Sequence, residues 1–595
     1  MGEVTTVRTD LVVIGETMAG VCAAVRATAE GLRVVITCTG SALGGSFPSL
    51  GALETHFPGV RAPLIEEFRN RVKSYYRTRY GEDSPQYQTC VSLNPQDPFL
   101  TFEPHVAREI IEGLVSEQSN ITVLRGVHPV SVERAGRTLN AVTVAAFSDG
   151  TRTRLEARVF VDASDEGDFA ALAGVPYRVG RESRTEYGET HAGRIFTQWL
   201  HGKFPIDAAE GRLRLYPKWT TMGLFSGSTG EGDHRIQAYS YRVCLTDDPA
   251  NRLPIERPPA YDRAAYLAIA QSPDQYAGVP YALHNRFLTD SPHDMVARDH
   301  IIHGHPLPNR KRSWNAATFP GANYAYPEAD WETRRAIARQ HRDHALGILY
   351  FMQNDPDMPE DLRASARQWG LAADEFTESA GFPDYIYARE GRRIVGRYTF
   401  TEYDASLAPG KLRAPTYADS IAFTDFPLDS LACSAERRPG TLPDGQMFLM
   451  EQSRPGCVPY RVLLPEHIDN LLVAVCVSVT HVAWGVLRQN TLQMHIGEVV
   501  GFAAVLALES GTSPGQLDID MLQRRLLDRG VMICFFNDVD MTTDARWVSA
   551  VQWCGARGFF DSYDALPDAA YGDDLTRAQA CQRLYDAHFA AKTRE

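Results

Sequence analysis

The sequence lacks the cysteine and histidine patterns that mark metal sites and disulfide frameworks. Its ten cysteines form no C-x-x-C pair and no cluster with histidine at metal-ligand spacing, which predicts reduced, buried thiols. His300, His303 and His305 lie close together, but without a carboxylate or cysteine at matching spacing we interpret them as a solvated loop. The sequence therefore predicts no metal site.

Excess positive charge and long apolar runs are also missing. The net charge of −14 argues against binding to nucleic acid or to an anionic membrane. The longest apolar run, Val499–Leu508, is too short to span a bilayer, and the polar start MGEVTTVRTD leads directly into a strand. We expect a cytoplasmic protein that acts on a small-molecule substrate, and the oligomeric state stays open.

The stretch around which the chain is organised is Thr9–Gly20, TDLVVIGETMAG. Four apolar residues, Leu11–Ile14, run into Gly15, and Gly20 opens a helix of small residues before a second apolar strand at Val34–Ile36. This order predicts a β-α-β unit with a tight turn at Gly15 and close packing at Gly20. The helix N-terminus would offer free N–H groups to a pyrophosphate.

Two residues of this unit depart from the usual dinucleotide pattern. Thr17 stands at the middle glycine of G-x-G-x-x-G, where it adds a hydroxyl donor but leaves less room. Counting back from Gly44 and Gly45, Cys38 falls where an acid usually holds the adenosine ribose. On this stretch alone, a dinucleotide site and an ordinary buried β-α-β unit are both open.

The rest of the chain predicts one α/β fold interrupted by a second domain. A helix over 103–116 and strands over 121–124, 127–132, 141–147 and 155–161 complete residues 1–175, the first part of a Rossmann-like domain. Residues 176–456, with helices at 331–354 and 362–369, form an inserted α+β substrate domain. Residues 457–515 return to the first domain with a strand at 471–475 and a helix at 492–510, and 516–595 form a helical appendage.

Several blocks in order resemble the FAD-dependent oxidoreductase family whose members are often labelled xanthan-lyase-like. They are GETMAG, LGG at Leu43–Gly45 and the blocks at Phe160–Ser183, Asn323–Arg335, Tyr387–Asp404, Val458–Arg488 and His495–Leu508. The resemblance implies a glutathione-reductase-type FAD fold, in which a Thr17-like residue is common.

The resemblance also assigns cofactor positions. It implies that Gly15, Thr17 and Gly20 hold the FAD pyrophosphate and that Gly44 and Gly45 lie on the ribityl side. It places Asp162, Ala163 and Gly167 beside the adenosine and pyrophosphate, and Ser478 and the helix at Leu492 near the flavin ring. Glu16, Cys38 and Asp165 depart from the family pattern at this site, as do Gln489, Asn490 and Thr491 before the flavin helix.

Four residues are candidates for substrate chemistry. His481 lies where the fold brings loops to the flavin, and a neutral imidazole there would accept a proton; a structural histidine is the alternative. Arg488 would clamp a substrate carboxylate or face the flavin C2 carbonyl, or else brace a loop. Asn315 and His56 lie in loops that the family fold places near the substrate, where a plain surface-loop role is equally open. The charged run at Arg389–Arg393 is expected to form an internal ion-pair network between the domains.

The favoured hypothesis is an FAD-dependent oxidoreductase that takes a hydride from a CH–OH or CH–NH centre of a small polar or glycosyl-like substrate. The alternative is a protein of the same fold that has lost redox use of FAD and catalyses an elimination, cyclisation or isomerisation. A non-catalytic binding protein on this scaffold is a third, weaker hypothesis.

Overall fold

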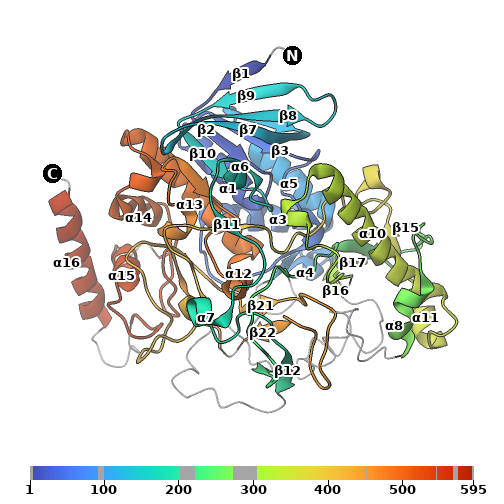
Figure 1. The fold of residues 1–595 in the computed structure, drawn as a ribbon. Coiled ribbons are helices and arrows are strands. Elements are labelled where there is room, and N and C mark those ends of the chain that lie inside the picture. Colours follow the sequence, from blue (N-terminus) through green and yellow to red (C-terminus); the bar gives the residue numbers. More distant parts are fainter. Residues whose placement is uncertain are drawn as a thin grey trace.

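A five-stranded parallel sheet forms the centre of the computed structural model, which describes residues 4–91, 99–200, 221–271, 304–315, 317–450, 452–543, 546–566 and 574–592. Its strand order is β24-β10-β2-β3-β6. The strands are β24 (Leu471–Val473), β10 (Val159–Asp162), β2 (Leu11–Ile14), β3 (Val34–Cys38) and β6 (Ile121–Arg125). Because β24 pairs with β10, a strand from the last third of the chain completes a sheet begun at residue 11, as the sequence predicts (Figure 1).

Two apolar helices pack together beside this sheet. They are α1 (Met18–Ala29) and α13 (Asn490–Glu509). A Cβ at Gly497 would lie 2.3 Å from the Ala19 carbonyl oxygen, so this glycine permits the close approach of the two helices. The length and mean hydropathy of α13 would suit a membrane span, but 94% of its apolar window is buried inside the fold. Its apolar character is therefore explained by its place in the core.

A second sheet of four strands lies above the first, at the N-terminal end of the molecule (Figure 1). Its order is β1-β9-β8-β7, with bounds Thr5–Arg8, Arg152–Glu156, Thr138–Ala146 and Val127–Ala135. The single strand predicted at 155–161 is wrong, because the chain leaves this sheet after Glu156 and enters the parallel sheet at Val159. Leu155 and the run Val159–Val161 are apolar and together predict one strand, although the charged residues Glu156 and Arg158 flank the break at Ala157.

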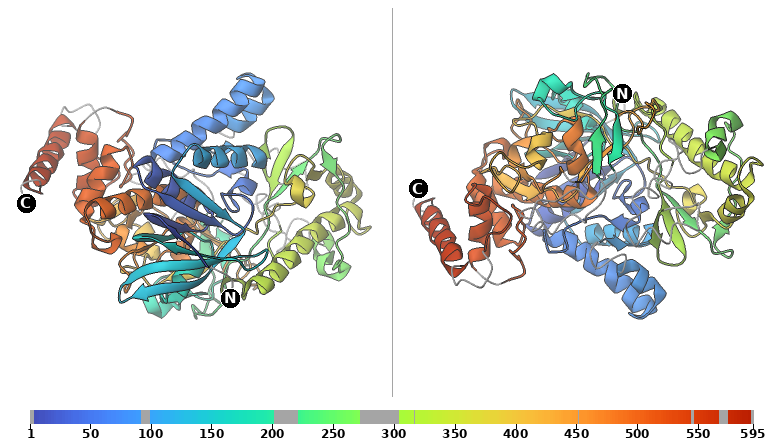
Figure 2. Two further views of the ribbon diagram at one scale, coloured as in Figure 1. Left: turned by 90° about the horizontal axis from the view of Figure 1, so that it is seen from above. Right: turned by 90° about the horizontal axis from the view of Figure 1, so that it is seen from below.

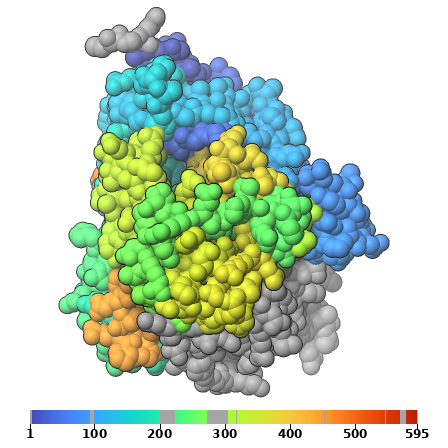
Figure 3. All heavy atoms as spheres, turned by 90° about the vertical axis from the view of Figure 1, so that its right-hand side faces the viewer, coloured from blue at the N-terminus to red at the C-terminus, as the bar shows by residue number. Residues whose placement is uncertain are grey.

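The middle of the chain builds a sheet and core of its own. Its five strands have the order β15-β18-β14-β17-β16, with bounds Arg252–Leu253, Gly370–Ala372, Val243–Thr246, Lys311–Trp314 and Gly304–Leu307. The long helix α10 (Trp331–Asn354), at its predicted bounds, and α11 (Glu360–Ala366) contribute to a separate apolar cluster. Figure 3 shows green and yellow residues of this segment covering one face of the molecule. The domain limits drawn from the sequence stay predictions.

The last residues are helical, as predicted, and join the main core. They form α14 (Ile519–Asp528), α15 (Trp547–Ala556) and α16 (Asp574–Lys592). Leu526 of α14 and Trp553 of α15 belong to the same apolar cluster as α1 and α13. The red C-terminal helices and the yellow-green α10 lie on opposite sides of the parallel sheet (Figure 2).

The remaining elements are short except for two helices near the N-terminus. The helices are α2 (Phe47–Leu50), α3 (Pro63–Tyr80), α4 (Pro85–Val91), α5 (Pro104–Ser116), α6 (Asp168–Leu172), α7 (Arg184–Tyr187), α8 (Leu267–Gln271) and α12 (His481–Leu487). The strands are β4 (Ala52–Leu53), β5 (Leu100–Thr101), β11 (Tyr177–Arg178), β12 (Thr197–Leu200), β13 (Thr221–Leu224), β19 (Arg393–Ile394), β20 (Ser420–Phe423), β21 (Leu428–Ser430), β22 (Met447–Leu449) and β23 (Cys457–Pro459).

The contact between α1 and α13 makes a testable prediction about stability. Gly497→Ala is expected to lower the free energy of unfolding by about 1–3 kcal/mol, because the new methyl group overlaps backbone atoms of Ala19. The matched control is Gly113→Ala in α5, where a Cβ would meet only side-chain atoms, at 3.7 Å and 3.9 Å. That change should be neutral or stabilising by up to about 1 kcal/mol. Equal denaturant midpoints for the two variants would contradict this account of the helix contact.

Candidate functional site

The turn after β2 shows why its two glycines are needed. Gly15 has a φ of +110°, and a Cβ there would lie 2.5 Å from the carbonyl oxygen of Ala163, on the neighbouring strand end. At Gly20 a Cβ would lie 2.5 Å from the Gly15 carbonyl oxygen. Both glycines therefore allow β2, α1 and the end of β10 to pack closely, which holds the N-terminus of α1 at the carboxyl end of the sheet.

Thr17 and Gly45 shape the N-terminus of α1. The Thr17 hydroxyl donates to the carbonyl of Ala163 (2.7 Å) and caps α1 by accepting from the amide of Gly20 (3.4 Å). Gly45 has a φ of +55°, and a Cβ there would meet Thr17 only at 3.8 Å and a side-chain oxygen of Asp165 at 3.6 Å. Gly44 anchors this loop by donating its amide to the carbonyl of Glu16 (2.7 Å). The result is a cradle of backbone against a positive helix end, which fits a pyrophosphate.

Acidic side chains crowd this cradle, as the sequence indicates. Burial raises the pKa of Glu16 above its usual value. Burial, reinforced by the carboxyl groups of Glu166 and Glu16, raises the pKa of Asp165 well above its usual value. A raised pKa favours the protonated form, which lessens repulsion between these groups and a bound phosphate.

The Glu16 carboxyl group lies near the end of β3, where Cys38 replaces the acid that usually binds the adenosine ribose. It accepts a hydrogen bond from the hydroxyl of Thr39, the residue directly after β3. Cys38, at the end of β3, is fully buried and donates its thiol to the carbonyl of Ala42 (3.1 Å), while Tyr385 donates its hydroxyl to the same carbonyl (3.0 Å). Glu16 thus brings a carboxyl group from the first turn to the end of the second strand.

Three other predicted cofactor residues hold the neighbouring loops. Asp162 accepts from the amides of Ser164 (3.0 Å) and Ala170 (2.7 Å), so it fixes the turn from Ala163 to Gly167 before α6. Gly167 caps α6 with a φ of +71°. The Ser478 hydroxyl accepts from the amide of Gly396 (3.0 Å), which ties the loop after β24 to the loop after β19. Asp162 and Ser478 therefore shape the walls of the site.

His481 forms a buried ion pair, which differs from the neutral base expected from the sequence. Its Nδ1 lies 2.9 Å from Glu390, and its backbone amide donates to Glu182 (2.8 Å). Arg393 bridges the same two carboxylates. Burial lowers the pKa of His481, but Glu390 and then Cys433 outweigh it and raise that pKa to about 10. His481 is thus protonated at neutral pH, and it positions α12 against the segment before β19.

Arg488 and Asn315 are brought together through two residues that the sequence did not single out as a site. Arg488 donates to the Tyr387 hydroxyl (3.1 Å) and pairs with Asp429. Arg389 stacks on the Tyr387 ring at 4.2 Å and donates to the Asn315 side-chain oxygen (2.9 Å). The only sequence signal for Arg389 was the charged run AREGRR, which predicted an ion-pair network. Arg392 and Arg393 do pair, with Asp168 and Glu182.

His56 is held by Asp425 and aromatic neighbours. Its backbone amide donates to Asp425 (3.1 Å), and its ring packs against Phe426 at 5.2 Å. Burial lowers the pKa of His56, so its imidazole is neutral. Two residues earlier, Glu54 accepts from Arg242 (3.2 Å) and offers its carbonyl to the hydroxyl of Thr491 in the first turn of α13 (2.6 Å). The loop at 54–56 therefore connects Arg242 to the start of α13.

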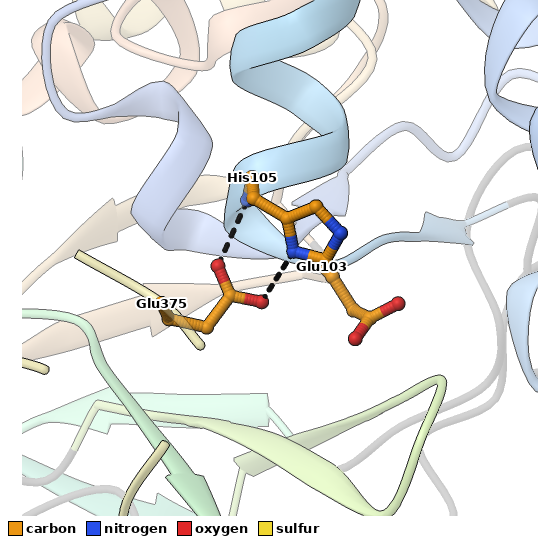
Figure 4. A group of neighbouring side chains, drawn as sticks. All are labelled: Glu103, His105 and Glu375. Carbon is orange, nitrogen blue, oxygen red and sulfur yellow. Dashed lines mark hydrogen bonds and ion pairs between the residues drawn. The ribbon is translucent and has the colours of Figure 1, made fainter. Parts of the chain in front are cut away.

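Glu103, His105 and Glu375 are grouped like the ligands of a metal ion, but the two glutamates bind a lysine. Figure 4 shows the backbone amide and Nδ1 of His105 bonded to the two carboxylate oxygens of Glu375, at 2.9 Å and 2.8 Å, with Glu103 close by. The Lys311 ammonium lies 2.6 Å from Glu103 and 2.7 Å from both Glu375 and Asp374. An internal cation thus neutralises these carboxylates. Of the histidine loop, His300 and His303 lie outside the described residues, and His305 bonds to Glu54 (3.1 Å).

Comparison with known proteins identifies the family. Residues 10–526 match the family described as FAD dependent oxidoreductase. The chain therefore belongs to this family of enzymes, and FAD is the cofactor that the membership assigns to it. No match was found among curated proteins.

Solved structures show only distant likeness. L-proline dehydrogenase from P. horikoshii is 15% identical, with 31% of this chain and 26% of that chain covered and a TM-score of 0.17. L-amino acid deaminase from Proteus vulgaris is 13% identical, with 34% and 56% covered and a TM-score of 0.21. The chain thus spans about a quarter to just over half of these two proteins. Overlaps this weak do not bear on the substrate.

Proposed function

We propose that the protein is an FAD-dependent oxidoreductase that takes a hydride from a CH–OH or CH–NH centre of a small polar substrate. The observation that carries the proposal is the backbone cradle at Gly45, which lies against Thr17 at the N-terminus of α1. FAD, when bound, supplies the electron acceptor. The chain supplies binding and orientation, through α1 for the pyrophosphate and the N-terminus of α13 for the flavin ring.

In this proposal, Glu16 replaces the acid that usually binds the adenosine ribose. Its carboxyl group reaches the end of β3 and bonds to Thr39, next to the position where Cys38 replaces the usual acid. The two departures therefore compensate each other, with one carboxyl group moved from the second strand to the first turn. Ribose hydroxyls would bond to Glu16 and to the Thr39 side chain.

The wild-type protein and Glu16→Gln test both statements. We expect freshly purified protein to show flavin absorbance that dithionite bleaches, and denaturation to release about one FAD per chain. Glu16→Gln should raise the Kd for FAD roughly three- to tenfold, because an amide NH2 replaces a carboxyl oxygen that accepts from a ribose hydroxyl, and a hydrogen bond between neutral groups contributes about 0.5–1.5 kcal/mol. The Kd for FMN, which has no adenosine, should not change.

Glu117→Gln is the matched control, because Glu117 is exposed on the far end of α5 and pairs with Arg71. It should retain wild-type affinity for both flavins. Colourless protein that takes up no added FAD would contradict the proposed oxidoreductase function and favour the alternative of a non-redox reaction. Flavin-loaded protein in which Glu16→Gln binds FAD normally would overturn only the role of Glu16.

We also propose that the protein acts in the cytoplasm on a small-molecule substrate and that it binds neither nucleic acid nor a membrane. The net charge of −14 supports this, as does the burial of α13.

A further inference from the structure

Three buried arginines converge on one tyrosine between the domains. Arg242 precedes β14, Arg389 and Tyr387 precede β19, and Arg488 links α12 to α13. The Arg389 and Arg242 guanidinium carbons lie 4.2 Å and 5.9 Å from the Tyr387 ring centre, and Arg488 donates to the Tyr387 hydroxyl. Each of the three arginine residues is at most 6% exposed to solvent. The cluster adjoins the start of α13, the helix that faces the flavin in the proposed function.

The charges in this cluster do not balance. Arg242 pairs with Glu54, and Arg488 pairs with Asp429. Arg389 makes no ion pair with any of the residues that the structure describes. Its partners are neutral: the side-chain oxygens of Asn315 at 2.9 Å and Ser240 at 3.4 Å. Three cations thus face two carboxylates, which leaves one positive charge.

A buried cation without a counterion destabilises the folded protein. The presence of such a cation at Arg389 therefore indicates that an anion binds there. Burial, and the like charges of Arg488 and Arg242, lower the pKa of Arg389 to about 10, which reflects the same imbalance. The backbone is held as well, because Trp484 donates its indole N–H to the Arg389 carbonyl (2.6 Å). Tyr387 and Asn315 fix the plane and one edge of the guanidinium, and Arg389 Nε has no hydrogen-bond partner among the described residues.

We propose that Arg389 binds an anionic group of the substrate, a carboxylate, beside the N-terminus of α13. This proposal rests on the proposed function and narrows its substrate class to hydroxy or amino compounds that also carry a carboxylate. A planar guanidinium matches a planar carboxylate through paired hydrogen bonds. The assignment moves the carboxylate clamp from Arg488, which Asp429 already neutralises, to Arg389.

The first test uses stability without ligand. Arg389→Met should leave the melting temperature unchanged or raise it, because the substitution removes a buried charge that has no counterion. Arg393→Met is the matched control, since Arg393 is equally buried but pairs with Glu182 and Glu390. That variant should melt at a lower temperature. A comparable loss in both variants would show that Arg389 is compensated in the empty protein and would overturn the proposal.

The second test uses acetate and benzoate as probes, with acetamide and benzamide as neutral counterparts, in titration calorimetry of the full chain. Wild type should bind the acids and not the amides. Arg389→Gln should weaken binding of the acids roughly tenfold or more, and Arg389→Lys should restore part of it. Equal binding of acids and amides, or unchanged binding in Arg389→Gln, would overturn the proposal.

The readout separates the two claims. Calorimetry detects carboxylate binding whether or not the chain carries FAD. If the protein binds carboxylates through Arg389 but takes up no flavin, the proposed oxidoreductase function is wrong and the anion site stands. If the protein binds flavin but not carboxylates, the anion site is wrong and the proposed oxidoreductase function stands.

Discussion

Lys311→Met is expected to lower the free energy of unfolding by about 3–5 kcal/mol, because it removes one partner from a buried ion cluster. The ammonium lies within 2.7 Å of oxygens of Glu103, Asp374 and Glu375. Glu103 and Glu375 are almost fully buried, so they would be left without their cation. Chemical denaturation followed by circular dichroism measures the difference.

Lys411→Met is the control for Lys311→Met. Lys411 pairs with Asp561 at the surface, where the two side chains are 42% and 76% exposed, so its loss should change stability by less than about 1 kcal/mol.

Removal of the lysine also predicts that the remaining side chains bind a metal ion. Zinc should stabilise Lys311→Met, through Glu103, His105 and Glu375, and leave wild type unchanged. Similar stability losses in the two lysine variants would contradict the buried-cluster account.

The second large effect is a pH dependence that originates at His481. The folded pKa is raised to about 10, against about 6.5 in an unfolded chain. A raised pKa stabilises the fold fully below about pH 6.5, and this stabilisation is lost as the pH rises toward 10. Wild type should therefore lose on the order of a few kcal/mol between pH 7 and pH 10 through this residue.

His481→Gln isolates this contribution, because it removes the titrating group and keeps a polar side chain. The difference in unfolding free energy between wild type and His481→Gln should shrink as the pH rises from 7 to 10. His467→Gln is the control, since the His467 side chain is 65% exposed, and its difference from wild type should stay constant. A constant difference for His481→Gln as well would mean that His481 is neutral and would restore it as a candidate base.

The sequence predicted the framework of the fold because its signals are local. Leu11–Ile14 and the helix after Gly15 carry their own apolar and glycine pattern, and so does the 24-residue helix α10. The return of β24 to the sheet was predicted from the apolar strand at 471–475 and the helix at 492–510, and the matching blocks of the family agreed with it. The break at Ala157 was missed because β9 and β10 differ in their partners, and composition does not record partners.

The candidate site was only partly predictable, because its chemistry depends on contacts between distant residues. His481 was identified from its loop, but its charge depends on Glu390, 91 residues earlier in the chain. Arg488 and Arg389 look alike in sequence, and only the position of Asp429 distinguishes the neutralised arginine from the other. The carboxyl group of Glu16 appeared to be misplaced until its bond to Thr39 located it at the end of β3.

The position of β24 also governs how the protein can be made. Strands β2 and β10 emerge early from a ribosome, but the partner of β10 begins at Leu471 and the helix that covers α1 ends at Glu509. The growing chain must therefore hold an unpaired strand edge and an uncovered apolar helix through most of its synthesis. Such intermediates aggregate readily. Yield of soluble protein should consequently depend on chaperones and slow translation more than on the stability of the finished fold.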